Sequence, residues 1–135
     1  MLYNGHMNKT QCPGCGKLFQ TKQYQVYCTT KCRNEHEYKM WLVGQYDPTT
    51  KAGLAERFRL YLIKEANYKC EQCSWSGTNP VSGKSTLQVD HVDGNSANNC
   101  KDNLIVLCPN CHSLTPTYGA LNKGKGRKAR YVVVT

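Results

Sequence analysis

Nine cysteines in 135 residues constrain this chain more than any other feature, because eight of them fall into closely spaced pairs. The N-terminus lacks the basic, apolar and small-residue succession of a secretory signal, so we expect a cytoplasmic protein with reduced thiols. Paired thiols in that compartment indicate metal ligands before disulfides, and an odd count fits a closed disulfide framework poorly. The sequence therefore predicts two structural Zn²⁺ sites with four thiolates each: Cys12, Cys15, Cys28 and Cys32, and Cys70, Cys73, Cys108 and Cys111.

The composition indicates a protein that needs such metal sites. Only 10% of the residues are aromatic, and hydrophobic residues make up 39%, which predicts a thin core for a chain of this size. No run of eighteen apolar residues occurs, so we expect no membrane span. The ninth cysteine, Cys100, is left without a partner, and we expect an unpaired thiol there, either buried or exposed.

The charge is strongly positive and is concentrated at the C-terminal end. The formal net charge is +9, and two zinc–tetrathiolate centres would bring it to about +5. No acidic residue follows Asp102, whereas basic residues cluster at Lys123, Lys125, Arg127, Lys128 and Arg130. We expect a polyanion as the partner of this basic tail, residues 122–135. A solvated tail without a partner is the alternative.

Residues 10–44 are expected to form an N-terminal zinc finger with four cysteine ligands. Cys12 and Cys15 flank a tight Pro-Gly turn, and short strands are expected around Phe19 and over 24–27. Thr29 or Thr30 can cap a helix that runs to about residue 42. Such a helix would place the sulfurs of Cys28 and Cys32 on one side.

Residues 45–67 are expected to form a turn-rich linker, 45–53, and a helix, 54–67. Leu54, Phe58 and Leu62 share one face of that helix. Its basic residues fall elsewhere: Arg57, Arg59 and Lys64. We favour a packing helix with a solvated basic side over a helix dedicated to reading DNA.

Residues 68–121 carry the densest set of reactive side chains. The pattern predicts a strand over 86–90, a loop over 93–99, a buried strand over 104–107 and a short helix that begins near Pro109. In sequence, Asp90 and His91 close the first strand, and His112 follows Cys111.

This segment resembles the HNH endonuclease family in its zinc-stabilised, four-cysteine branch. The resemblance rests on LQVDHVDGN (87–95) and DNLIVLCPNCHSLT (102–115), which are framed by the second cysteine quartet. With its N-terminal finger, the chain also looks like small phage-encoded and homing-type HNH proteins. The resemblance implies a small, zinc-stabilised α+β protein, in which a ββα-metal core is preceded by a helix and a zinc finger.

The family resemblance also implies roles for four side chains. His91 would be the general base, and Asp90 and His112 would hold one divalent cation, Mg²⁺ or Mn²⁺. Asn103 would fix the loop and orient His91. The activity implied is metal-dependent cleavage of double-stranded DNA, most simply nicking, that leaves 5′-phosphate and 3′-hydroxyl ends. We expect a monomer, with a dimer as the alternative.

Two points remain open in the sequence. In a continuous strand Asp90 and His91 would face opposite sides, so the strand must end or turn there for both to reach one phosphate. A non-catalytic zinc protein that binds DNA on the same scaffold would explain the cysteines and the charge equally well. It would leave Asp90, His91, Asn103 and His112 unexplained. A finger module that binds RNA or protein would use residues 10–44 alone.

Overall fold

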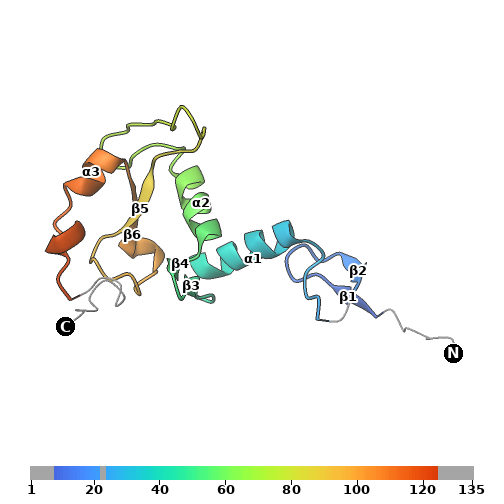
Figure 1. Cartoon of the computed structure of the whole chain (residues 1–135). Helices are drawn as coiled ribbons and strands as arrows, with labels where there is room; N and C mark the ends of the chain where they lie inside the picture. The colour runs from blue at the N-terminus through green and yellow to red at the C-terminus, as the bar shows by residue number, and fades with distance from the viewer. Residues whose placement is uncertain (1–7, 22–23, 125–135) are drawn as a thin grey trace, which may run out of the picture. The chain divides into compact units, whose positions relative to one another are not determined.

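The computed structural model describes residues 8–21 and 24–124 of the chain. The chain forms two compact units, Met1–Tyr46 and Asp47–Thr135 (Figure 1). Four of the expected DNA-binding residues, Lys125, Arg127, Lys128 and Arg130, lie outside the described residues. Within the described ranges, no helix combines the length and apolar character needed to cross a membrane.

The first unit combines a small hairpin with one helix. β1 (Lys9–Gln11) pairs antiparallel with β2 (Leu18–Gln20), and α1 (Thr30–Leu42) follows. The expected helix is confirmed: the side chain of Thr29 caps it by accepting the backbone N–H of Cys32 at 3.1 Å. The strand expected over 24–27 is wrong. Tyr24 adopts a left-handed φ of 70°, which is incompatible with a strand.

The second unit opens with a hairpin where the sequence predicted only a linker. β3 (Thr49–Thr50) pairs with β4 (Gly53–Leu54). Gly53 has a φ of 101°, a conformation that glycine adopts readily. The hairpin is short, but it fixes the side chain of Thr49 in space.

α2 (Glu56–Glu65) is shorter than the expected helix over 54–67. It begins later because Leu54 belongs to β4, and it ends earlier because Asn67 and Tyr68 both adopt positive φ. Phe58, with no exposed surface, lies on its buried face together with the buried Leu62 and Ile63. That face contacts the following strand, β5.

The centre of the second unit is an antiparallel pair of strands followed by a helix (Figure 1). β5 (Gln88–His91) pairs with β6 (Leu104–Leu107), with His91 opposite Leu104. α3 (Pro109–Ser113) contacts both strands, and two 3-10 turns, Lys101–Asn103 and Gly119–Leu121, flank this core. The described chain is therefore a small α+β protein, and the expected order of strand, loop, strand and helix is confirmed.

Candidate functional site

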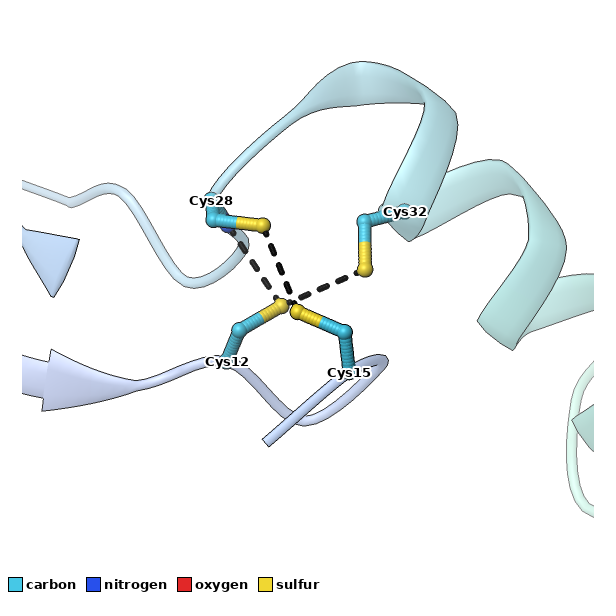
Figure 2. A group of neighbouring side chains, drawn as sticks. All are labelled: Cys12, Cys15, Cys28 and Cys32. Atoms are coloured by element: carbon cyan, nitrogen blue, oxygen red, sulfur yellow. Dashed lines mark hydrogen bonds between the residues drawn. The ribbon is translucent and has the colours of Figure 1, made fainter. Parts of the chain in front are cut away.

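The first cysteine quartet converges on one point (Figure 2). Cys12 and Cys15 lie on the turn after β1, Cys28 precedes α1, and Cys32 lies in its first turn. The sulfurs of Cys12 and Cys32 are 3.4 Å apart, and those of Cys15 and Cys28 are 3.6 Å apart. Tetrahedral zinc with Zn–S bonds of about 2.3 Å would separate its sulfurs by about 3.8 Å. The quartet therefore fits a zinc ion.

In this quartet the surroundings of Cys12 favour its thiolate form. Burial opposes ionisation of Cys12, but hydrogen bonds from the backbone N–H groups of Cys28, Cys15 and Gly14 outweigh it and lower its pKa to about 6. The Cys32 thiol, hydrogen-bonded to Cys12, has its pKa raised to about 12. The pKa of Cys28 is raised as well, mainly by burial, so zinc binding must displace protons from Cys28 and Cys32.

The second quartet fits zinc in the same way and is more deeply buried. Its four sulfur atoms lie within 4.8 Å of one another. Cys108 is the N-cap of α3, and its sulfur accepts the N–H of Cys111 at 3.4 Å. Burial opposes the Cys70 thiolate, yet backbone donors led by Cys108 lower the pKa of Cys70 to about 6. Glu71 bonds the backbone of Val106 in β6, which ties this zinc site to the strand pair.

Cys100 belongs to neither quartet. It forms no disulfide bond, which agrees with the expected unpaired thiol, and it is exposed, so the alternative of a buried thiol is wrong.

Asp90, His91 and His112 line one open pocket of the second unit, which we call the Asp90–His112 pocket. β5 ends at His91, and the chain then turns: the N–H of Gly94 donates to the carbonyl of His91 at 2.9 Å. Both residues are still paired with β6, Asp90 with Ile105 and His91 with Leu104, so the strand ends after this step and not between the two residues as the sequence required; both nevertheless line the pocket. α3 brings His112 to the same place.

Asp90 and His112 are spaced to share a cation. Their Oδ1 and Nε2 atoms are 3.8 Å apart, too far for a hydrogen bond. Donors about 2.1 Å from an octahedral ion lie about 3.0 Å apart when adjacent and about 4.2 Å apart when opposite, so this pair would hold a cation after a small adjustment of either side chain. Both side chains are about one-fifth exposed. The ring of His112 also meets Tyr118 edge-on at 5.2 Å between centroids.

His91 is held by a residue that the sequence did not single out. Its Nε2 lies 2.7 Å from Oδ1 of Asn99, which is buried at 5% exposure. The Asn99 amide in turn donates to the hydroxyl of Thr49 at 2.9 Å. No local sequence pattern could reveal the Asn99–Thr49 contact, because the two residues are fifty positions apart.

Asn103 clamps the base of the loop between the strands. Its Nδ2 donates to Asp93 Oδ1 and to the carbonyl of Asn98, both at 2.9 Å, and its Oδ1 accepts the N–H of Asp93 at 3.1 Å. The Asn98 side chain, the Asn95 N–H and Asn103 together lower the pKa of Asp93 from 3.8 to about 2, against partial burial. The carboxylate is therefore a permanent acceptor at neutral pH.

Arg59 brings a positive charge to the Asp90–His112 pocket. It extends from α2, lines the pocket and is 27% exposed, with Glu56 3.9 Å away. The sequence pattern predicted Arg59 on the solvated side of a packing helix. That interpretation did not include the pocket, because only the fold brings α2 beside β5.

The loop at the rim of the pocket is joined to the segment that leads to the basic tail. The Asn122 amide donates to the carbonyl of Gly94 at 2.7 Å. Gly94 has a φ of +73°, and a Cβ there would lie 2.4 Å from Asn122 Oδ1 and 2.9 Å from Thr117 Cγ2. Glycine is therefore required for this contact. Lys123, the described member of the expected DNA-binding set, follows at once and is exposed.

Comparisons with known proteins give two partial matches. A stretch of 61 residues is 48% identical to the H-N-H endonuclease F-TflIV of Escherichia phage T5, covering 43% of this chain and 25% of that protein. A stretch of 78 residues is 33% identical to the Zorya protein ZorE of Escherichia coli, covering 56% of this chain and 20% of that protein. The matched stretches thus span about a quarter or less of each relative. No protein-family model and no solved structure matches the chain.

Proposed function

We propose that this protein is a metal-dependent DNA endonuclease of the HNH type, with Asp47–Thr135 as its nuclease unit. The observation that carries the proposal is the meeting of Asp90, His91 and His112 on one pocket, with the cation of Arg59 beside them. The partial identity with a phage H-N-H endonuclease supports the same chemistry. The zinc quartets are structural in this proposal, because four thiolates leave no open position for substrate.

The proposed reaction is hydrolysis of a phosphodiester. His91 accepts a proton from water, the water oxygen attacks phosphorus, and the bond to the 3′ oxygen breaks. The 3′ oxygen leaves with a proton taken from solvent, which gives 3′-hydroxyl and 5′-phosphate ends. A divalent cation held by Asp90 and His112, Mg²⁺ or Mn²⁺, would neutralise the phosphate and the leaving oxygen. Arg59 would add positive charge to the same phosphate.

In this proposal Asn103 does not contact the reacting atoms and acts by holding the loop after His91. Its three hydrogen bonds to the loop hold the backbone that follows His91. One such pocket per chain favours nicking of one strand, and two chains or two turnovers would be needed to cut both. The basic tail, residues 122–135, would follow the DNA backbone and neutralise phosphates.

A plasmid-relaxation assay with Mg²⁺ or Mn²⁺ tests the proposal. We expect the wild type to convert supercoiled circles to open circles, and His91→Ala to bind DNA with little change and to lose at least about 10²-fold in rate. His36→Ala is the matched control, because His36 lies in the first unit and bonds Tyr27 at 3.1 Å. Undiminished nicking by His91→Ala would refute the assignment of the base. Binding without any cutting by the wild type would leave the non-catalytic DNA-binding protein.

A further inference from the structure

Asn99 is the one polar residue in the buried class among the residues that the structure describes. Burial of an amide is unfavourable unless both its oxygen and its nitrogen find partners. Asn99 meets this condition with His91 on one side and Thr49 on the other, at 2.7 and 2.9 Å. The placement of this amide therefore needs an explanation beyond packing.

The contact with Thr49 fixes the direction of the series. Nδ2 of Asn99 donates to the hydroxyl oxygen of Thr49 at 2.9 Å. Thr49 is itself held by Asp47, whose Oδ1 accepts the backbone N–H of Thr49 at 2.9 Å. With its nitrogen directed to Thr49, the amide presents its oxygen to His91.

This order leaves one possible tautomer for a neutral His91 ring. An acceptor oxygen 2.7 Å from Nε2 requires that Nε2 carry the hydrogen. The other ring nitrogen, Nδ1, then holds the lone pair that can take a proton. His91 lines the Asp90–His112 pocket, whereas Asn99 and Thr49 are absent from its lining, so they act on the pocket through His91.

We propose that Asn99 is a positioning residue that holds His91 in the Nε2–H tautomer, and that Thr49 and Asp47 fix the orientation of the Asn99 amide. The hairpin β3–β4 would thus determine that Nδ1 of His91, a residue far along the chain, is the atom that accepts the proton. This inference rests on the proposed function, in which His91 is the general base. The competing explanation is that Asn99 only ties the loop to the hairpin.

Two changes separate these explanations. Asn99→Leu keeps the size of the side chain but removes the acceptor, and Asn99→Asp keeps an acceptor oxygen. We expect Asn99→Leu to lower kcat for nicking by about 10- to 100-fold with KM for DNA within about 2-fold, because general-base catalysis contributes about 10²–10⁴ and the base itself is still present. Asn99→Asp should recover a large part of that loss.

Thr49 provides a milder test on an exposed residue, should Asn99→Leu fail to fold. Thr49→Val removes the hydroxyl that orients the amide, so we expect kcat to fall several-fold, and Thr49→Ser should restore it. Thr50→Val is the matched control, since the Thr50 hydroxyl bonds Gly53 and Ala52 within the same hairpin. It should leave nicking within about 2-fold of wild type. Equal losses in Thr49→Val and Thr50→Val would overturn the proposal in favour of hairpin stability.

Nitrogen-15 NMR of the zinc-loaded full chain reads the tautomer without any need for catalysis. In the wild type, with the ring neutral, we expect the hydrogen of His91 on Nε2, and in Asn99→Leu a mixture of both tautomers. An unchanged tautomer together with unchanged kcat in Asn99→Leu would overturn the proposal. If the wild type does not nick DNA, the proposed function fails, and the NMR result still decides whether Asn99 sets the tautomer.

Discussion

Replacing Asn103 by alanine removes three hydrogen bonds from one loop, and the loss can be estimated. A neutral hydrogen bond contributes about 0.5–1.5 kcal/mol to stability and one to a charged group somewhat more. Asn103 makes two of its bonds to neutral groups and one to the Asp93 carboxylate, all in a half-buried setting. We expect Asn103→Ala to destabilise the unit Asp47–Thr135 by about 2.5–3 kcal/mol, at the lower end of the summed range of about 2.5–6 kcal/mol.

Native-state hydrogen exchange of the zinc-loaded chain measures this loss at the amides of β6, which lie in the buried core. Asn95→Ala is the matched control in the same loop. Asn95 is exposed, and its side chain bonds only the N–H of Ala97, so its loss should stay below about 1 kcal/mol. A difference under about 0.5 kcal/mol between Asn103→Ala and wild type would refute the role of Asn103 as a clamp.

The same clamp makes a prediction about pH. The pKa of Asp93 is lowered from 3.8 to about 2 in the folded state, so its stabilising contribution is fully present above about pH 4 and is lost only as pH falls toward 2. The destabilisation by Asn103→Ala should therefore be the same at pH 6 and pH 8. A loss that varied across this range would mean that another titrating group, and not the Asp93 carboxylate, controls the clamp.

Two further predictions concern the zinc quartets and Arg59. We expect metal analysis to give two zinc ions per chain, and a single zinc in the wild type would show that one quartet does not bind metal. Cys108→Ser should bind one zinc and lose the hydrogen-exchange protection of β5 and β6, because structural zinc contributes about 10–16 kcal/mol to the folding of small domains. Cys32→Ser should also bind one zinc but keep that protection, since its quartet lies in the other unit. Arg59→Ala should lower kcat/KM for nicking by about 10- to 100-fold, and Glu56→Gln, which removes only the exposed partner of Arg59, should change it by less than about 2-fold. Equal effects of these two substitutions would show that Arg59 acts through helix stability.

The sequence revealed the parts of this protein whose signals are local. Cysteine spacing identified both quartets, because a turn or a first helical turn brings such pairs together without help from the rest of the fold. The helix that starts at Thr30 and the strand over 104–107 were predicted from a cap and from an unbroken apolar run. Asp90, His91 and His112 were also singled out, and the fold brings them to one pocket.

The failures all depend on contacts between distant segments or on backbone conformation. Residues 24–27 have the composition of a strand, but Tyr24 takes a left-handed conformation. The segment 45–53 looked like a linker because its hairpin has only two residues in each strand. Asn99 is one of several polar residues in a loop, and only tertiary structure buries it against His91.

The bond between Asn122 and Gly94 holds the last described residues against the loop beside the Asp90–His112 pocket. Asn122 also lines that pocket, so a truncation that removed it would take away part of the pocket wall and leave the carbonyl of Gly94 without this donor. Truncated versions of the chain should accordingly retain Asn122.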